Sequence, residues 1–279
     1  MPSLQDFNLQ TLDLKTLEKM SFESEVFLFK QSNGGEDYTA RYKNDPHFNE
    51  LIEYTVKLKR KIVAHFKSLK DKIPMLVAVD KLSAADYSYG SNGLEDYWLY
   101  PYAWEKEQND LGSVLYDFLL PIIIIGAMSL ERELAYHSNI HDDNSPAIKE
   151  IRKTALKYSK GITDTTKGMI LEQIKTSTSL AETRDQLVSR LNKLIDNEIR
   201  AELIAQTESV RAYSEGRHMI AEELGLEKKV WEATFGACPI CLGLNNVEIN
   251  ATEAFPGGYP YPPAHPRCKC SIRYYTPFE

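Results

Sequence analysis

The sequence predicts an α+β protein that is mainly α, with helices through most of its 279 residues and a small β/loop lobe at the end. Between residues 47 and 225, apolar residues recur every three or four positions in several segments, as they do in amphipathic helices. After Gly225 this periodicity stops, and a segment rich in proline, glycine and cysteine follows. We therefore expect four regions: an extended arm (1–46), a mainly helical N-terminal domain (47–140), a helical bundle (141–225) and the β/loop lobe (226–279).

Composition excludes several classes of protein. The hydrophobic fraction of 43% and the charged fraction of 26% are ordinary for a soluble globular protein and exclude a mostly disordered or collagen-like chain. A net charge of −7 argues against attraction of the whole molecule to nucleic acid. The longest apolar run, 118–130, is shorter than the ~20 residues of a membrane span and contains Pro121, so we expect a buried segment and no membrane partner. The N-terminus lacks a secretory signal, which favours the cytoplasm.

The first helix is expected over residues 48–69, and one of its faces is basic. Its apolar residues lie mostly three or four apart, as on one side of a helix. Such a basic face is usually only solvated. The alternative is a surface that faces an acidic partner or DNA phosphates, for which the candidate residues are Lys57, Arg60, Lys61 and Lys67. We expect weak, sequence-independent DNA binding at most.

An aromatic segment follows the turns at Gly90 and Gly93. Tyrosine and tryptophan bury a large area and keep a polar group, a combination that suits protein interfaces. The alternative is that these rings fill the core of the N-terminal domain. The candidate partner-binding residues are Tyr97, Trp98, Tyr100, Tyr102 and Trp104.

Further helices are expected up to Gly225. A buried helix pair bent at Pro121 should cover 111–136, and a polar linker should cover 137–145. Pro146 should begin a helix that stops before Gly161.

The rest of the bundle carries three further helix signals. Asp164 should cap a new helix, and Ser179 with Glu182 forms a capping box for the next. A long helix should run from about Asn197 to Leu224 and end at Gly225. Short strands are expected within 230–235 and 271–275.

All four cysteines lie in the last fifth of the chain, in two groups that favour metal binding. A disulfide framework is not expected in a long cytosolic chain, because the cytosol keeps thiols reduced. Cys238-Pro-Ile-Cys241 and His265-Pro-Arg-Cys268 each place two ligands three residues apart around a proline. Two such turns supply four ligands that suit tetrahedral Zn²⁺. Cys270 competes with His265 for the fourth position, and we favour His265.

We expect this zinc to be structural. A catalytic zinc usually has three protein ligands and an open position, whereas four or five candidates are present here. The zinc deaminase signature requires a glutamate two residues after the histidine, where this chain has Arg267. The lobe is poor in core residues, so a metal would supply much of its stability.

Two patterns together carry a family resemblance. The first is Arg200-Ala-Glu-Leu-Ile-Ala-Gln-Thr-Glu208 with Tyr213 and Gly216 downstream. The second is the cysteine region, above all the Pro-Pro-x-His-Pro-x-Cys-x-Cys pattern of 262–270. Over about residues 145–276 the chain resembles the phage head-morphogenesis family, the Mu-F-like minor head proteins.

The resemblance implies a minor capsid protein that associates with the portal during procapsid assembly and supports DNA packaging or delivery. Scaffold and major capsid proteins are further implied partners. The implied location is the virion, at the capsid interior or portal vertex, with assembly in the host cytoplasm. The resemblance implies no enzymatic activity. Two alternatives stay open: a zinc hydrolase or N-terminal effector carried by a capsid-targeting C-terminal domain, and a weak DNA-binding factor.

Glu208 is the one acid within the resemblance that calls for two interpretations. It shares a helix face with Arg211 and Glu215, so these side chains can pair. The functional interpretation is a catalytic acid. The structural interpretation, which we favour, is a hydrogen-bonding cluster against the metal lobe.

Overall fold

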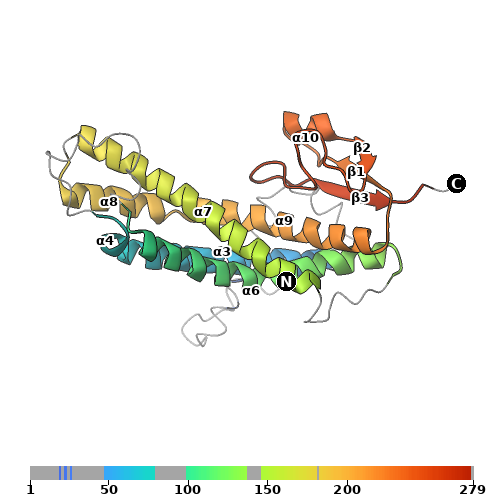
Figure 1. The fold of residues 1–279 in the computed structure, drawn as a ribbon, viewed down its shortest axis with the longest axis horizontal. Helices are drawn as coiled ribbons and strands as arrows, with labels where there is room; N and C mark the ends of the chain where they lie inside the picture. Colours follow the sequence, from blue (N-terminus) through green and yellow to red (C-terminus); the bar gives the residue numbers. More distant parts are fainter. Residues whose placement is uncertain are drawn as a thin grey trace, which may run out of the picture.

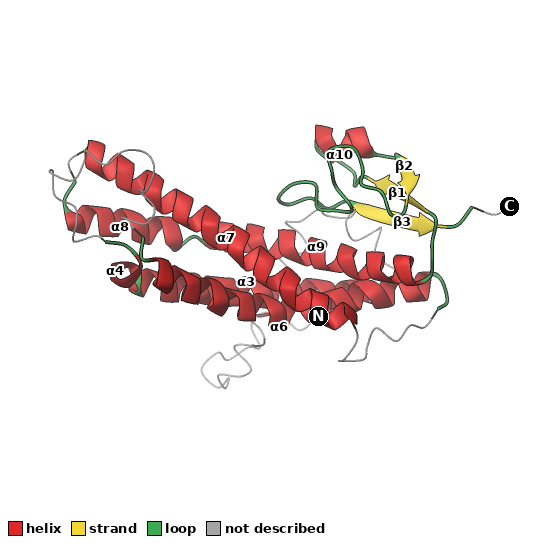
Figure 2. Cartoon of the chain, in the orientation of Figure 1, coloured by secondary structure: helices red, strands yellow, loops and turns green. Residues whose placement is uncertain are grey.

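The computed structural model describes residues 47–78, 99–136, 146–180 and 182–277, with Lys19, Phe22, Glu23 and Val26. Long helices form an elongated body, and a small sheet lies beside one end of it (Figures 1 and 2). This architecture confirms the predicted fold class. The predicted linker 137–145, and all but those four residues of the predicted arm, lie outside the described residues. The helices of the body are α3 (His47–Asp71), α4 (Ile73–Leu76), α6 (Pro101–Glu133), α7 (Pro146–Ser179), α8 (Arg184–Ile195) and α9 (Glu198–Glu223).

Helix α6 is the centre of the body, because α3, α7 and α9 all pack against it. By length and composition alone α6 is able to cross a membrane, and half of its most apolar window is buried inside the protein. Core helices of soluble proteins also pass that test. Leu115, Ile122 and Ile123 are each at most 1% exposed, so these side chains belong to the core.

Pro121 does not divide this segment. The predicted helix pair is a single helix, and Pro121 lies inside it. A proline removes one backbone hydrogen bond, but α6 is held on three sides by other helices, and such packing supplies most helix stability in proteins.

Two glycines allow α6 and α9 to approach closely. A Cβ atom on Gly126 of α6 would overlap the main-chain carbonyl of Tyr213 on α9. A Cβ atom on Gly216 of α9 would overlap the carbonyl of Ile123 on α6. Only glycine lacks this atom, so the sequence itself permits the contact between the two backbones.

The predicted break in α7 is wrong. The helix begins at Pro146 as expected, but it continues through Gly161 and Asp164 to Ser179. A glycine inside a helix costs about 1 kcal/mol relative to alanine. Ile162, Ile170 and Ile174 lie in the shared core and outweigh that cost.

The capping box of α8 lies further along the chain than predicted. Thr183 and Gln186 form it, because each side chain accepts a hydrogen bond from the other residue's backbone N–H. The predicted partners bond elsewhere: Ser179 donates to the carbonyl of Thr176, and Glu182 pairs with Arg190. The α9 prediction is confirmed, since Asn197 caps the helix and Gly225 follows it with a φ of +63°.

The lobe contains an antiparallel sheet in the order β2-β1-β3. Strand β1 (Lys228–Glu232) pairs with β3 (Ser271–Tyr275), with Val230 opposite Arg273. On its other side β1 pairs with β2 (Glu248–Asn250). The predictions for β1 and β3 are confirmed, whereas β2 and helix α10 (Pro239–Leu244) had no sequence signal that we used.

Two cores stabilise the described part of the molecule. The larger runs from Leu51 to Tyr213, so the regions predicted as N-terminal domain and bundle share one core. The smaller joins the lobe to the ends of α6 and α9. In it Trp231 meets Phe255 edge to face, with ring centroids 5.2 Å apart.

Candidate metal centre

Two turns bring the predicted ligands together. Cys238 is the N-cap of α10, and its carbonyl accepts a hydrogen bond from the amide of Leu242 at 2.9 Å. In the second turn the Cys268 amide donates to the carbonyl of His265 at 3.1 Å. Arg267 adopts a φ of +62° within this turn. The local backbone therefore places both ligands of each turn on the same side.

Three pairs of donor atoms lie close to the separations found around a tetrahedral zinc ion. His265 Nε2 lies 3.1 Å from Cys238 Sγ and 3.2 Å from Cys241 Sγ. Cys241 Sγ lies 3.7 Å from Cys268 Sγ. Usual zinc bond lengths place two sulfurs about 3.8 Å apart and a sulfur and a nitrogen about 3.6 Å apart. Cys238, Cys241 and His265 lie within 4.8 Å of one another, whereas Cys268 joins only Cys241 and Cys270 in such a group, so the four predicted ligands hold one ion only if the two turns move closer.

The orientation of His265 also suits a ligand. Its Nδ1 lies 2.8 Å from the carbonyl oxygen of Pro266. A carbonyl only accepts hydrogen bonds, so Nδ1 carries the proton and Nε2 presents its lone pair to the cysteines. Metal-bound histidines are commonly held by such a bond from the other ring nitrogen.

Five donors are available, and they form two overlapping groups. Cys238, Cys241 and His265 form one, while Cys241, Cys268 and Cys270 form the other. The cluster is thus of the Cys₃His or Cys₄ type and could hold a metal.

Burial and hydrogen bonds between the thiols shift the pKa values of the cysteines in opposite directions. Burial raises the pKa of Cys241 to about 12. A hydrogen bond from the Cys268 thiol lowers the pKa of Cys270 to about 6 and raises that of Cys268 itself. A divalent cation would hold these sulfurs as thiolates, so the chemistry of the donor set fits a metal.

The second turn is anchored to α9. Thr207 donates to the carbonyl of Leu203 at 2.7 Å and accepts from the amide of Arg267 at 3.3 Å. Glu208 is buried beside it, and Arg211 donates to its carboxylate at 2.6 Å. Burial raises the pKa of Glu208. These contacts favour the structural interpretation of Glu208.

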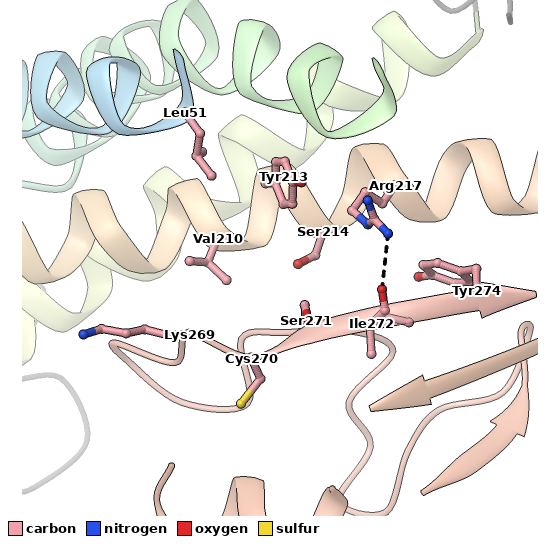
Figure 3. A pocket seen from close by; sticks show the side chains of 10 residues that line it. All are labelled: Leu51, Val210, Tyr213, Ser214, Arg217, Lys269, Cys270, Ser271, Ile272 and Tyr274. Atoms are coloured by element: carbon pink, nitrogen blue, oxygen red, sulfur yellow. Dashed lines mark hydrogen bonds between the residues drawn. The ribbon is translucent and has the colours of Figure 1, made fainter. Parts of the chain in front are cut away.

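Arg217 connects the bundle to the lobe, as Figure 3 shows. This buried residue of α9 donates to Ser129 at 3.1 Å and to Glu133 at 2.7 Å, both on α6. It also donates to the carbonyl of Ile272 on β3 at 3.4 Å. The adjoining cavity, whose wall includes Cys270, measures about 20 Å³, too small for anything larger than a water molecule.

Lys229 is a second residue whose role the sequence did not indicate. It is 1% exposed, and its Nζ donates to the carbonyl of Pro260 at 2.9 Å. Burial lowers the pKa of this lysine to about 8. The bond holds the proline-rich segment that precedes His265 onto the sheet. No pattern in the sequence pairs a strand lysine with a carbonyl 31 residues later.

The aromatic candidates lie in different surroundings. Trp104 is 1% exposed, and its Nε1 donates to the carbonyl of Leu76 at 3.0 Å, so it belongs to the core rather than to a partner surface. Tyr102 is 84% exposed and Tyr100 36%. Tyr97 and Trp98 lie outside the described residues. Partner binding through Tyr100 and Tyr102 stays a prediction.

Much of the basic face of α3 is occupied by contacts within the protein. Lys57 lies over the ring of Tyr54, 5.1 Å from its centroid, and Arg60 lies over the ring of Phe22. Lys61 and Lys67 are exposed, and neither forms an ion pair with a described residue. Two free cations on this face are few for a DNA-binding surface.

Comparison with known proteins relates part of the chain to a protein family. Residues 169–273 match the family described as Phage Mu protein F like protein. The matched segment contains α9, both turns of the metal centre and most of β3. It confirms the resemblance, though the match begins later than residue 145. No curated protein and no solved structure matches the chain.

Proposed function

Since residues 169–273 form a Phage Mu protein F-like domain, we propose that this protein is a minor head protein that associates with the portal during procapsid assembly. In that role it supports the packaging or delivery of DNA. Family membership of this domain implies a location in the virion, and the portal vertex or capsid interior is the position we propose. Scaffold and major capsid proteins are further proposed partners.

The observation that carries the proposal is the position of the family match. It covers the helix that anchors the second turn and every donor of the metal centre. The N-terminal half of the body lies outside the match but shares its core with α9. The whole described body would therefore move with the domain as one unit.

We propose a structural Zn²⁺ held by Cys238, Cys241, His265 and Cys268. When bound, the ion joins two loops that have few backbone hydrogen bonds to each other. The presence of a fifth donor, Cys270, argues against the open coordination position of a catalytic zinc. We accordingly propose that the protein is not an enzyme.

Co-sedimentation with its cognate portal protein tests the assembly role. The expected result is that the purified chain sediments with assembled portal and stays in the supernatant alone. Tyr102→Ala tests the exposed aromatic residue, and Lys160→Ala, an exposed residue of α7, is the matched surface control. Absence of the chain from portal pellets and from procapsids would overturn the proposal.

A further inference from the structure

A groove of about 690 Å³ lies between α7, α9 and the proline-rich segment before the metal centre. Helices α7 and α9 both pack on α6, and long side chains rather than close backbone contacts join them to each other here. Tyr259 and Tyr261 form one wall, together with Pro260 and Pro263. The metal lobe therefore supplies a groove wall, a role separate from its own folding.

The positive charge of Arg200 in this groove is not neutralised by a described residue. Arg200 donates through Nη2 to Thr166 Oγ1 at 2.7 Å and lies over the ring of Phe66. No carboxylate among the described residues contacts it, and its Nε and Nη1 have no hydrogen-bond partner there. Burial lowers the pKa of Arg200, yet an arginine keeps its charge in proteins. A partly buried cation without a counter-charge favours an anionic ligand.

A second cation lies in the same groove. Lys157 of α7 is exposed and has no partner among the described residues. Arg211 also lines the groove, but Glu208 neutralises it. The anionic groups of a ligand therefore belong near Arg200 and Lys157, and its apolar groups belong near the tyrosines and prolines.

Groove length and shape indicate an extended chain. Arg200 and Arg211 mark its ends on α9 and lie about 16 Å apart along the helix axis. An extended peptide covers this distance with about five residues. Grooves lined by aromatic rings bind stiff, proline-containing segments in other proteins.

We propose that this groove binds an extended acidic peptide segment, with leucine or proline between its acidic residues, from a partner protein. Single-stranded DNA is the disfavoured occupant, because Glu208 lies in the groove and the chain carries a net charge of −7. The groove proposal rests on the proposed function in one respect: a partner protein of the phage head would supply the peptide. Binding of a synthetic peptide tests it without the portal.

The test uses three fluorescent probes and the full-length protein. These are (Asp-Leu-Pro)₃, (Lys-Leu-Pro)₃ and a thymidine oligonucleotide, each about nine units long so that it exceeds the groove. Fluorescence anisotropy at moderate salt should show saturable binding of the acidic peptide alone. Tighter binding of the basic peptide or the oligonucleotide would overturn the proposal, as would no binding of the acidic peptide at about 1 mM.

Gly161 offers a blocking variant with a matched control. It lines the groove, and a Cβ atom there meets nothing within 4 Å. Gly168 lies on the same helix with the same open space, but outside the groove lining. Gly161→Trp should weaken peptide binding about tenfold by filling the groove, and Gly168→Trp should change it less than twofold. Equal weakening by both variants, with unchanged circular dichroism, would refute the location.

Charge reversal supplies an independent comparison. Lys157→Glu should weaken the acidic peptide about fivefold, while Lys160→Glu, one turn further along α7 and outside the groove lining, should have little effect. Portal co-sedimentation of the same variants separates the two proposals. Peptide binding without portal association would overturn only the assembly role. Portal association of the wild type without any binding of the acidic peptide would overturn only the groove.

Discussion

His65 is a partly buried histidine of α3 whose charge state affects stability. Burial lowers its pKa below 6.5, and Lys72 acts in the same direction, while Glu107 and Asp110 partly oppose it. The unfolded chain therefore binds a proton more readily than the folded one. This contribution to the free energy of unfolding is complete above about pH 6.5 and declines as the pH falls further.

Replacing this histidine should flatten that pH dependence. His65→Gln should lose less stability than the wild type between about pH 7 and pH 5, because glutamine does not titrate. Urea unfolding followed by circular dichroism at several pH values measures the two slopes. The metal centre is the same in both proteins, so its own pH dependence cancels in the difference. Parallel slopes would contradict the prediction.

Trp104 and Tyr102 are two residues apart on α6 and should respond oppositely to truncation. Trp104→Ala removes a fully buried ring and one of the two hydrogen bonds that the Leu76 carbonyl accepts, the other coming from the Tyr100 amide, so it should cost about 3–5 kcal/mol. Tyr102→Ala changes a surface residue and should stay within about 0.5 kcal/mol of the wild type. Chemical unfolding of both variants gives the comparison. Equal losses would show that the segment packs differently.

At the level of elements, Cys241 decides whether the lobe is held by metal. It belongs to both groups of donors, so its loss leaves neither group with three ligands. Cys241→Ala should therefore bind well under one equivalent of zinc and lose hydrogen-exchange protection in α10 and in the loop before β3. Helices α6 and α9 should stay protected, because most of their contacts lie in the larger core.

Cys270→Ala is the matched comparison for the fourth ligand. With His265 as that ligand, this variant should retain about one equivalent of zinc. His265→Ala should then lose zinc, although Cys270 is still present. Elemental analysis of the three purified variants distinguishes the ligand sets. Zinc loss in Cys270→Ala with retention in His265→Ala would assign the site to four cysteines.

The elements that could be predicted from sequence are those with local signals. Asn197 and Gly225 mark the two ends of α9 by their own chemistry, and the two proline-containing turns mark the donors. The errors arose where tertiary packing outweighed local preference. Pro121 and Gly161 both interrupt a helix pattern. Helices α6 and α7 nevertheless continue past these residues, because both helices are buried against their neighbours.

The ligands of the metal site could be predicted from the sequence, but the contacts of the residues around them could not. Residue type and spacing identify Cys238, Cys241, His265 and Cys268. The roles of Lys229 and Arg217 depend on carbonyls of Pro260 and Ile272, which come near only when the lobe folds against α9. Backbone carbonyls occur at every residue, so no sequence pattern marks these partners.

For the whole molecule, electrostatics should keep DNA binding weak. The net charge is −7, and among the proposed contact residues on the described face only Lys61 and Lys67 lack a described partner. Any binding to duplex DNA should be independent of sequence and disappear as salt rises from about 50 to 200 mM. The double variant Lys61→Gln/Lys67→Gln should lose most of this DNA binding. Filter binding or fluorescence anisotropy measures the loss. An affinity for duplex DNA that persists at the higher salt concentration would contradict the prediction.

The contact between Gly126 and Gly216 determines which substitutions the chain tolerates. In a library of single substitutions selected for folded protein, both positions should accept glycine alone. Every other residue carries a Cβ atom, and at these positions that atom would overlap a main-chain carbonyl. Gly161 and Gly168, also within helices, should accept most residues and gain stability with alanine. Related chains that share the α6–α9 crossing should therefore keep glycine at both positions, whatever else changes along the two helices.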